Sequence, residues 1–306
     1  IVRQHGPWST DVKVEYKPGR QDRVFLPILS TDSEEFRREA ARERDAFFGP
    51  GGLRALEDSL RAAYSVLEPV IGYEESPYFL KHGLNLGADT IAVKDVKGDE
   101  PRATSLLAVA NTASDALILQ FYEEEDLHKA AMGHELSIAD WKRIAGIKDK
   151  YEDLLFAAPI VSANTSVQLL RELRSEICRR GRVFSFLCGH DSTIETLMTA
   201  LGVEPFELQD ALEGKTPIGV KVVLELYSKA GGGQYFKLRL VYPQYQRLRE
   251  LRPFSLEDPP ASCTLSLKGM EADDCGYYRL QDLLRRIDDA RAAGKDAARG
   301  IAPTYI

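Results

Sequence analysis

The spacing of apolar residues along the chain predicts mainly helices as far as residue 156. Apolar side chains recur every three to four positions there, as they do on the buried face of a helix. Ser33 and Ser137 offer N-cap side chains ahead of two of these segments. The stretch from about 84 to 103 is polar and Gly-bearing at Lys94 to Glu100, which is typical of a loop. Helices are therefore expected at Glu34–Phe48, Leu53–Leu67, Thr112–Glu123 and Ser137–Phe156.

The pattern changes near residue 160, where short apolar runs begin to alternate with helical segments. Val183–Cys188 is almost wholly apolar, as expected of a strand buried in a sheet. Two alternating runs, Val220–Tyr227 and Gln234–Tyr242, are separated by Gly231 to Gly233 and predict a hairpin. Near the N-terminus, a short strand is predicted at Val12–Tyr16. Helices are expected from a cap at Asn164 or Thr165 to about Arg180, at Ile194–Leu201 and at about Leu280–Ala292.

This order of elements predicts two domains, one of which is formed by two separate segments of the chain. Residues 1–28 and 157–306 carry the strands and are expected to form an α/β core. Residues 29–156 are expected to form an inserted helical domain that acts as a cap.

Composition and charge limit the classes of binding partner that are expected. The 306 residues carry 40 basic and 47 acidic side chains, a net charge of −7, with no basic stripe among aromatic residues. Nucleic-acid binding is therefore not expected. No run of about 18 apolar residues is present, so no membrane span is expected either. A phosphate ligand would have to be recognised locally, by a few placed side chains.

The most informative motif is Gly189-His190-Asp191, placed between the predicted strand and a helix. Ligands of α/β sheets bind at the carboxyl ends of strands, and free N–H groups at a helix start favour phosphate. Ser192 and Thr193 would also face such a ligand. His190 would supply a hydrogen-bond donor, and Asp191 a general acid for a leaving alkoxide.

A structural interpretation of the same motif stays open from these residues alone. At many strand-to-helix turns the Asp only caps the helix and the His is structural.

The surrounding residues resemble the histidine acid phosphatases, the family of acid phosphatases, glucose-1-phosphatases and phytases. Phe186 to Ile194 is similar to the Gly-His-Asp segment of that family, and the similarity is greatest to its bacterial glucose-1-phosphatase branch. The other matching segments follow in the family's order: Phe25–Phe36, Leu119–Glu123, Tyr151–Pro159, Thr216–Val223 and Ala272–Gly276.

The resemblance implies a three-layer core with a mixed, mostly parallel sheet. It implies hydrolysis of small phosphomonoesters, such as a sugar phosphate or phytate, through a phosphohistidine. His190 would contact phosphate and Asp191 would donate the proton, with Gly189, Ser192 and Thr193 at the substrate. No metal or other cofactor is implied. The family also implies a periplasmic or secreted location.

The chain departs from the family pattern at the nucleophile. No Arg-His-Gly-x-Arg-x-Pro motif is present, and Arg3-Gln4-His5-Gly6 is a poor substitute because a residue separates Arg from His. The first residue is not Met. We therefore expect the N-terminal part of the core to lie upstream of Ile1. The alternative is a catalytically inactive, phosphatase-like fragment that at most binds phosphorylated ligands. Thr193 also stands where many relatives carry Asn, which bears on substrate choice.

The four cysteines, Cys178, Cys188, Cys263 and Cys275, leave the redox state open. A Cys263–Cys275 disulfide would suit an oxidising compartment, and four reduced thiols are the alternative.

Overall fold

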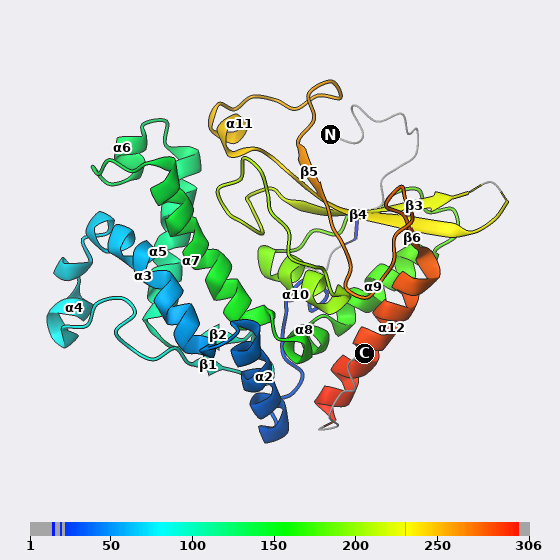
Figure 1. Cartoon of the computed structure of the whole chain (residues 1–306), viewed down its shortest axis with the longest axis horizontal. Helices are drawn as coiled ribbons and strands as arrows, with labels where there is room; N and C mark the ends of the chain where they lie inside the picture. The colour runs from blue at the N-terminus through cyan, green and yellow to red at the C-terminus, as the bar shows by residue number, and fades with distance from the viewer. Residues whose placement is uncertain (1–13, 16–18, 20–21, 230, 300–306) are drawn as a thin grey trace.

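The computed structural model describes residues 14–15, 19, 22–229 and 231–299. Three helices, α3 (Gly52–Val70), α5 (Leu106–Glu123) and α7 (Ile138–Phe156), lie side by side in one half of the molecule (Figure 1). Their buried side chains, among them Phe121 and Trp141, form one core cluster. The smaller elements of this half are η1 (Tyr73–Glu75), α4 (Pro77–His82), β1 (Val93–Lys94), β2 (Arg102–Ala103) and α6 (Leu127–Ala130).

The second half of the molecule combines a sheet with the helices packed against it (Figure 1). A second core cluster, which includes Phe236 and Ile287, lies between them. The strands are β3 (Lys221–Ser228), β4 (Gln234–Tyr242), β5 (Ala261–Thr264) and β6 (Tyr278–Arg279). The helices are α8 (Pro159–Thr165), α9 (Val167–Cys178), α10 (Asp191–Leu201), α11 (Tyr245–Arg249) and α12 (Leu280–Ala298).

Helix α2 (Glu34–Phe47) joins the two halves. Leu29 and Phe36 pack with Ile160 and Ala297 in a third cluster that links α2 to α8 and α12. Arg44 of α2 donates two hydrogen bonds to the carboxylate of Asp95, at 2.6 and 2.8 Å, and both side chains are buried. The division into a core and a cap at residues 28 and 156 stays a prediction.

Most of the predicted elements are confirmed where capping and turn residues are strong. Ser33 accepts a hydrogen bond from the Phe36 N–H, and Ser137 forms a reciprocal capping box with Asp140. The hairpin of β3 and β4 turns through Gly231 to Gly233, all three with positive φ. Helix α5 begins six residues before the predicted start, α8 was not predicted, and α10 begins at Asp191 itself.

The predicted buried strand at Val183–Cys188 is wrong for this structure. The segment is in no strand and is exposed, with Phe184 at 60 % and Phe186 at 63 %. A strand needs a neighbour for its backbone groups, and within the described residues none pairs with it. The predicted mostly parallel sheet is not observed either. Every strand pairing in the described part of the chain is antiparallel.

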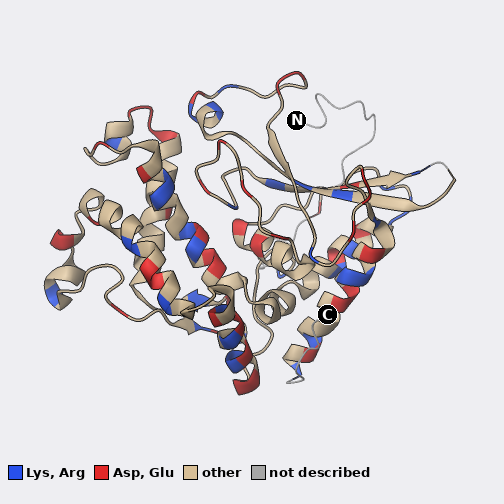
Figure 2. Ribbon diagram, in the orientation of Figure 1, with Lys and Arg blue, Asp and Glu red and all other residues tan. Residues whose placement is uncertain are grey.

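Other predictions concern the termini, the thiols and the surface. Most of the strand predicted at Val12–Tyr16, and His5, lie outside the described residues. All four cysteines are free thiols here, so no Cys263–Cys275 bridge is present. None of the described helices is long and apolar enough to span a membrane. Acidic and basic side chains are interspersed along the helices, for example on α2 and α12 (Figure 2).

Candidate active site

The side chain of Thr193 fixes the turn that precedes α10. Its Oγ1 accepts a hydrogen bond from the His190 N–H at 3.1 Å and donates one to the carbonyl of Phe25 at 2.6 Å. Gly189 lies so close that a Cβ there would stand 3.0 Å from the same Oγ1. Thr193 is itself buried, so it holds the turn against the N-terminal segment. Its predicted contact with substrate, and that of Gly189, stay predictions.

Asp191 and Ser192 line a cavity of about 480 Å³ between the two halves of the molecule. Helices α5 and α7 and the segment from Gly98 to Arg102 form its other walls. His190 caps α10 and is exposed beside the cavity. It faces the cavity residue Glu100: burial raises the pKa of Glu100, the positive charge of His190 lowers it, and Asp191 raises it.

Lys148 of α7 connects Asp191 to a second carboxyl group. Its Nζ lies 2.8 Å from Asp191 Oδ2 and 3.5 Å from Glu152 Oε1. Burial opposes a positive charge on Lys148, but Glu152 and Asp191 outweigh that effect and raise its pKa above the ordinary value. Lys148 therefore carries a positive charge at the edge of the cavity.

The pKa values of the two carboxyl groups beside Lys148 are shifted in opposite directions. Burial favours the neutral form of Asp191, but the attraction and hydrogen bond of Lys148 outweigh burial and lower its pKa. The N–H of Ser192 adds a 2.8 Å hydrogen bond to Asp191 Oδ1. Glu152 is more deeply buried, and burial raises its pKa well above 4.5 despite the attraction of Lys148. Lys148 thus favours the ionised form of Asp191, whereas burial favours the neutral form of Glu152.

This arrangement can bind an anion and deliver a proton. The start of α10 presents the positive end of a helix dipole, which favours phosphate oxygens. Lys148 adds a full positive charge within the same cavity. A phosphate dianion near Asp191 would repel its carboxylate and raise the pKa of that group. Glu152, whose pKa is raised by burial, could supply the proton that Asp191 would then take up.

Sequence reasoning located Asp191 and Ser192 in the cavity but missed Lys148, Glu152 and Glu100. The sequence did contain a signal for Lys148 and Glu152. Lys148 and Glu152 stand four residues apart on α7, on a helix with buried apolar residues such as Ile144 and Ile147. Charged residues at this spacing point to a paired, functional or structural role. Within the described residues, no group of three or more His, Cys, Asp or Glu side chains is arranged to hold a metal ion.

The fold is that of known phytases. The apo structure of Hafnia alvei phytase matches with a TM-score of 0.78 and covers 94 % of this chain and 73 % of that chain, at 18 % identity. A structure of the phytase from Citrobacter braakii matches with a TM-score of 0.75 at 20 % identity, covering 89 % of this chain and 70 % of that one. Identities this low show the fold alone. No family model matches the chain.

The curated relatives are closer in sequence. The glucose-1-phosphatase of Providencia rettgeri is 32 % identical over 279 residues, which is 89 % of this chain and 65 % of that protein. The glucose-1-phosphatase of Salmonella typhimurium is 30 % identical over 280 residues. These relatives indicate the histidine acid phosphatase family, and the chain is similar to its glucose-1-phosphatases. It spans 65 % of the length of each of them.

Proposed function

We propose that this chain is the proton-donating part of an acid phosphomonoesterase that acts on a small ester such as a sugar phosphate or phytate. The observation that carries the proposal is the position of Asp191, at the start of α10 in a cavity that also holds Lys148. The names of the relatives, glucose-1-phosphatase and phytase, support the substrate class. The family further supports a periplasmic or secreted location.

In the proposed reaction, the phosphoryl group lies at the start of α10, and His190 and Lys148 contact its oxygens. Lys148 moves from Asp191 toward the phosphate, and Asp191 then takes a proton from Glu152. As the bond between phosphorus and the leaving oxygen breaks, Asp191 gives this proton to the alkoxide. A positioned general acid accelerates such a step by about 10²- to 10⁴-fold.

The phosphoryl acceptor in this proposal is a histidine of an Arg-His-Gly-x-Arg-x-Pro motif, which the 306 residues do not contain. We infer that a segment upstream of Ile1 supplies it and packs near Val183–Cys188, where apolar side chains are exposed. The alternative, for the 306 residues alone, is binding of phosphate esters without turnover. It is favoured because no histidine lines the cavity in the described part of the chain, and His190 lies only beside it.

The test is hydrolysis of 4-nitrophenyl phosphate and glucose 1-phosphate at pH 5 by the protein translated with the sequence upstream of Ile1. Asp191→Asn should lower kcat by about 10²- to 10⁴-fold and leave the circular dichroism spectrum unchanged. Full activity of this variant would contradict the assignment of Asp191. The 306-residue chain should bind inorganic phosphate without turnover. Hydrolysis by that chain, lost in His5→Ala, would contradict the need for an upstream nucleophile.

A further inference from the structure

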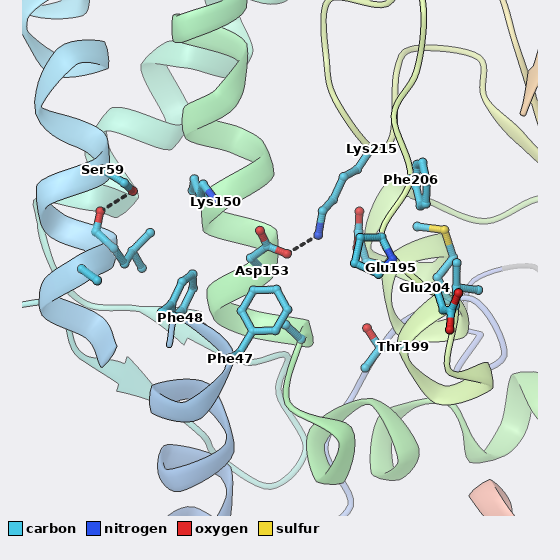
Figure 3. Close-up of a pocket in the computed structure, with 16 residues that line it drawn as sticks. Phe47, Phe48, Ser59, Lys150, Asp153, Glu195, Thr199, Glu204, Phe206 and Lys215 are labelled. Atoms are coloured by element: carbon cyan, nitrogen blue, oxygen red, sulfur yellow. Dashed lines mark hydrogen bonds and ion pairs between the residues drawn. The ribbon is translucent and has the colours of Figure 1, made fainter. Parts of the chain in front are cut away.

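A second cavity, of about 510 Å³, opens on other faces of α7 and α10. It shares no lining residue with the cavity that holds Asp191. The end of α2, one side of α3 and the segment that follows α10 close it (Figure 3). Nothing in the proposed phosphatase reaction uses this space.

Most of the wall of the second cavity is apolar. Phe47 and Phe48 lie on one side and Phe206 on the other (Figure 3). Leu56 and Met198 complete the apolar lining. Phe47 is 49 % exposed although it is a large aromatic residue, so part of this wall is open to a ligand.

The polar part of the cavity is a group of carboxylates around one lysine. Lys215 forms an ion pair with Asp153, and both line the cavity (Figure 3). Glu195 of α10 lies beside them and is only 4 % exposed. Its Oε1 is buried and, among the described residues, has no hydrogen-bond partner. Asp149, one turn before Asp153 on α7 and behind the cavity wall, also has one buried oxygen, Oδ1, without such a partner.

Three carboxyl groups here therefore share the charge of Lys215. Lys148 also faces Glu195 but is already in contact with Asp191 and Glu152. Lys150 lines the cavity from α7 but lies toward α3 and away from Glu195 in Figure 3. Burial, which Lys215 only partly offsets, raises the pKa of Glu195 to about 7. Within the described part of the chain, no second cation donates a hydrogen bond to Glu195 Oε1 or Asp149 Oδ1.

We propose that the second cavity binds a primary ammonium ion that carries a small aromatic or aliphatic body. The ammonium would donate a hydrogen bond to Glu195 Oε1 and face Asp153, while the apolar body packs on Phe47 and Phe206. A cation next to aromatic faces is stabilised further by the ring quadrupoles. An anion would be repelled by the carboxylates. A metal ion does not fit because the described carboxyl groups form no metal-binding cluster.

The test uses 2-phenylethylammonium as the probe, with the 306-residue chain and isothermal titration calorimetry at pH 8. Kd should be about 1 mM or tighter, and the neutral analogue 2-phenylethanol should bind at least tenfold more weakly, because its hydroxyl can donate a hydrogen bond to Glu195 but brings no positive charge to the carboxylates. Glu195→Gln should weaken binding of the ammonium about tenfold. Glu204→Gln, at the exposed rim of the same cavity, should leave Kd unchanged.

The pH dependence gives a second test in the unaltered chain. The ammonium binds ionised Glu195, which faces Asp149, Asp153, Lys148 and Lys215. Affinity should therefore fall as the pH decreases through about 7 and be at least tenfold weaker at pH 5.5. The proposal is overturned if the alcohol and the ammonium bind equally well, or if no binding is seen at 10 mM probe. It is also overturned if Kd is the same at pH 8 and 5.5, or if Glu204→Gln weakens binding as much as Glu195→Gln does. None of these results depends on phosphatase activity.

Discussion

Lys148 Nζ lies 2.8 Å from Asp191 Oδ2, and this contact keeps the candidate proton donor ionised while the cavity is empty. The charge on Asp191 is thus coupled to the position of one lysine. A ligand that attracts Lys148 changes the protonation of Asp191 without touching it.

Replacement of Lys148 tests this coupling directly. Lys148→Met should raise the pKa of Asp191, because burial then acts without the opposing cation. The measurement is the ¹³C chemical shift of the Asp191 carboxyl group against pH, assigned by its loss in Asp191→Asn. Lys148→Arg keeps the charge and is the matched control. An Asp191 titration that is the same in Lys148→Met and the unaltered chain would contradict the coupling.

Buried carboxyl groups predict how stability depends on pH. Burial raises the pKa of Glu43 to about 7, of Asp149 to about 6 and of Glu195 to about 7. Between pH 4.5 and 7 the folded chain holds protons that the unfolded chain releases, so the free energy of unfolding should fall as the pH rises. Urea denaturation should give a value lower by at least about 2 kcal/mol at pH 7.5 than at pH 5.

Glu43→Gln should reduce this pH dependence, because an amide accepts the hydrogen bond from the Ile160 N–H without titrating. Glu74→Gln, at an exposed position, is the control and should leave the slope unchanged. A free energy of unfolding that rises from pH 5 to pH 7.5 would show that these carboxyl groups are ionised in the folded chain.

The crossing of α8 and α12 depends on Gly294. A Cβ at this position would clash with the carbonyl oxygen of Ala163, while Asn164 Nδ2 donates a hydrogen bond to the Gly294 carbonyl at 3.0 Å. Gly294→Ala should lower the free energy of unfolding by about 1–3 kcal/mol. Gly146→Ala is the matched control, because a Cβ there meets nothing within 4 Å. It should raise stability by up to about 1 kcal/mol, since alanine favours a helix over glycine. Equal effects of the two changes in urea denaturation would rule out the clash.

The exposed segment Val183–Cys188 should make the 306-residue chain self-associate. Phe184→Ser with Phe186→Ser should lower the fraction of oligomer seen by sedimentation velocity, because exposed apolar patches drive association. The free energy of unfolding should change by less than about 0.5 kcal/mol, as for other exposed positions. A large loss of stability would mean that these side chains are buried in solution.

Local signals predicted the helices and the hairpin well. The capping box at Ser137 and Asp140 and the three glycines from Gly231 each determine a local backbone conformation without distant contacts. The strand predicted at Val183–Cys188 is not observed, because local signals do not suffice for a strand. Its apolar residues fit a buried strand, but a strand also requires a neighbouring backbone, which comes from elsewhere in a fold.

Of the residues that the motif predicted for the site, Asp191 and Ser192 line the cavity, whereas Gly189, His190 and Thr193 do not. Asp191 and Ser192 lie in the cavity because the turn and the start of α10 place them there. The contact of Lys148 with Asp191 depends on the packing of α7 against α10, which no local pattern in either segment reveals. The same holds for Glu100, which reaches the site from the loop before β2.

The buried charged residues of α7 and α10 form a continuous layer between the two cavities. Glu152 forms an ion pair with Lys148, which also contacts Asp191. The charge of Glu195, which lines the second cavity, raises the pKa of Glu152. If both proposed ligands bind, they would be thermodynamically linked, because a cation that ionises Glu195 makes it harder to ionise Glu152. By reciprocity, any factor by which one ligand changes the affinity for the other must act equally in the opposite direction.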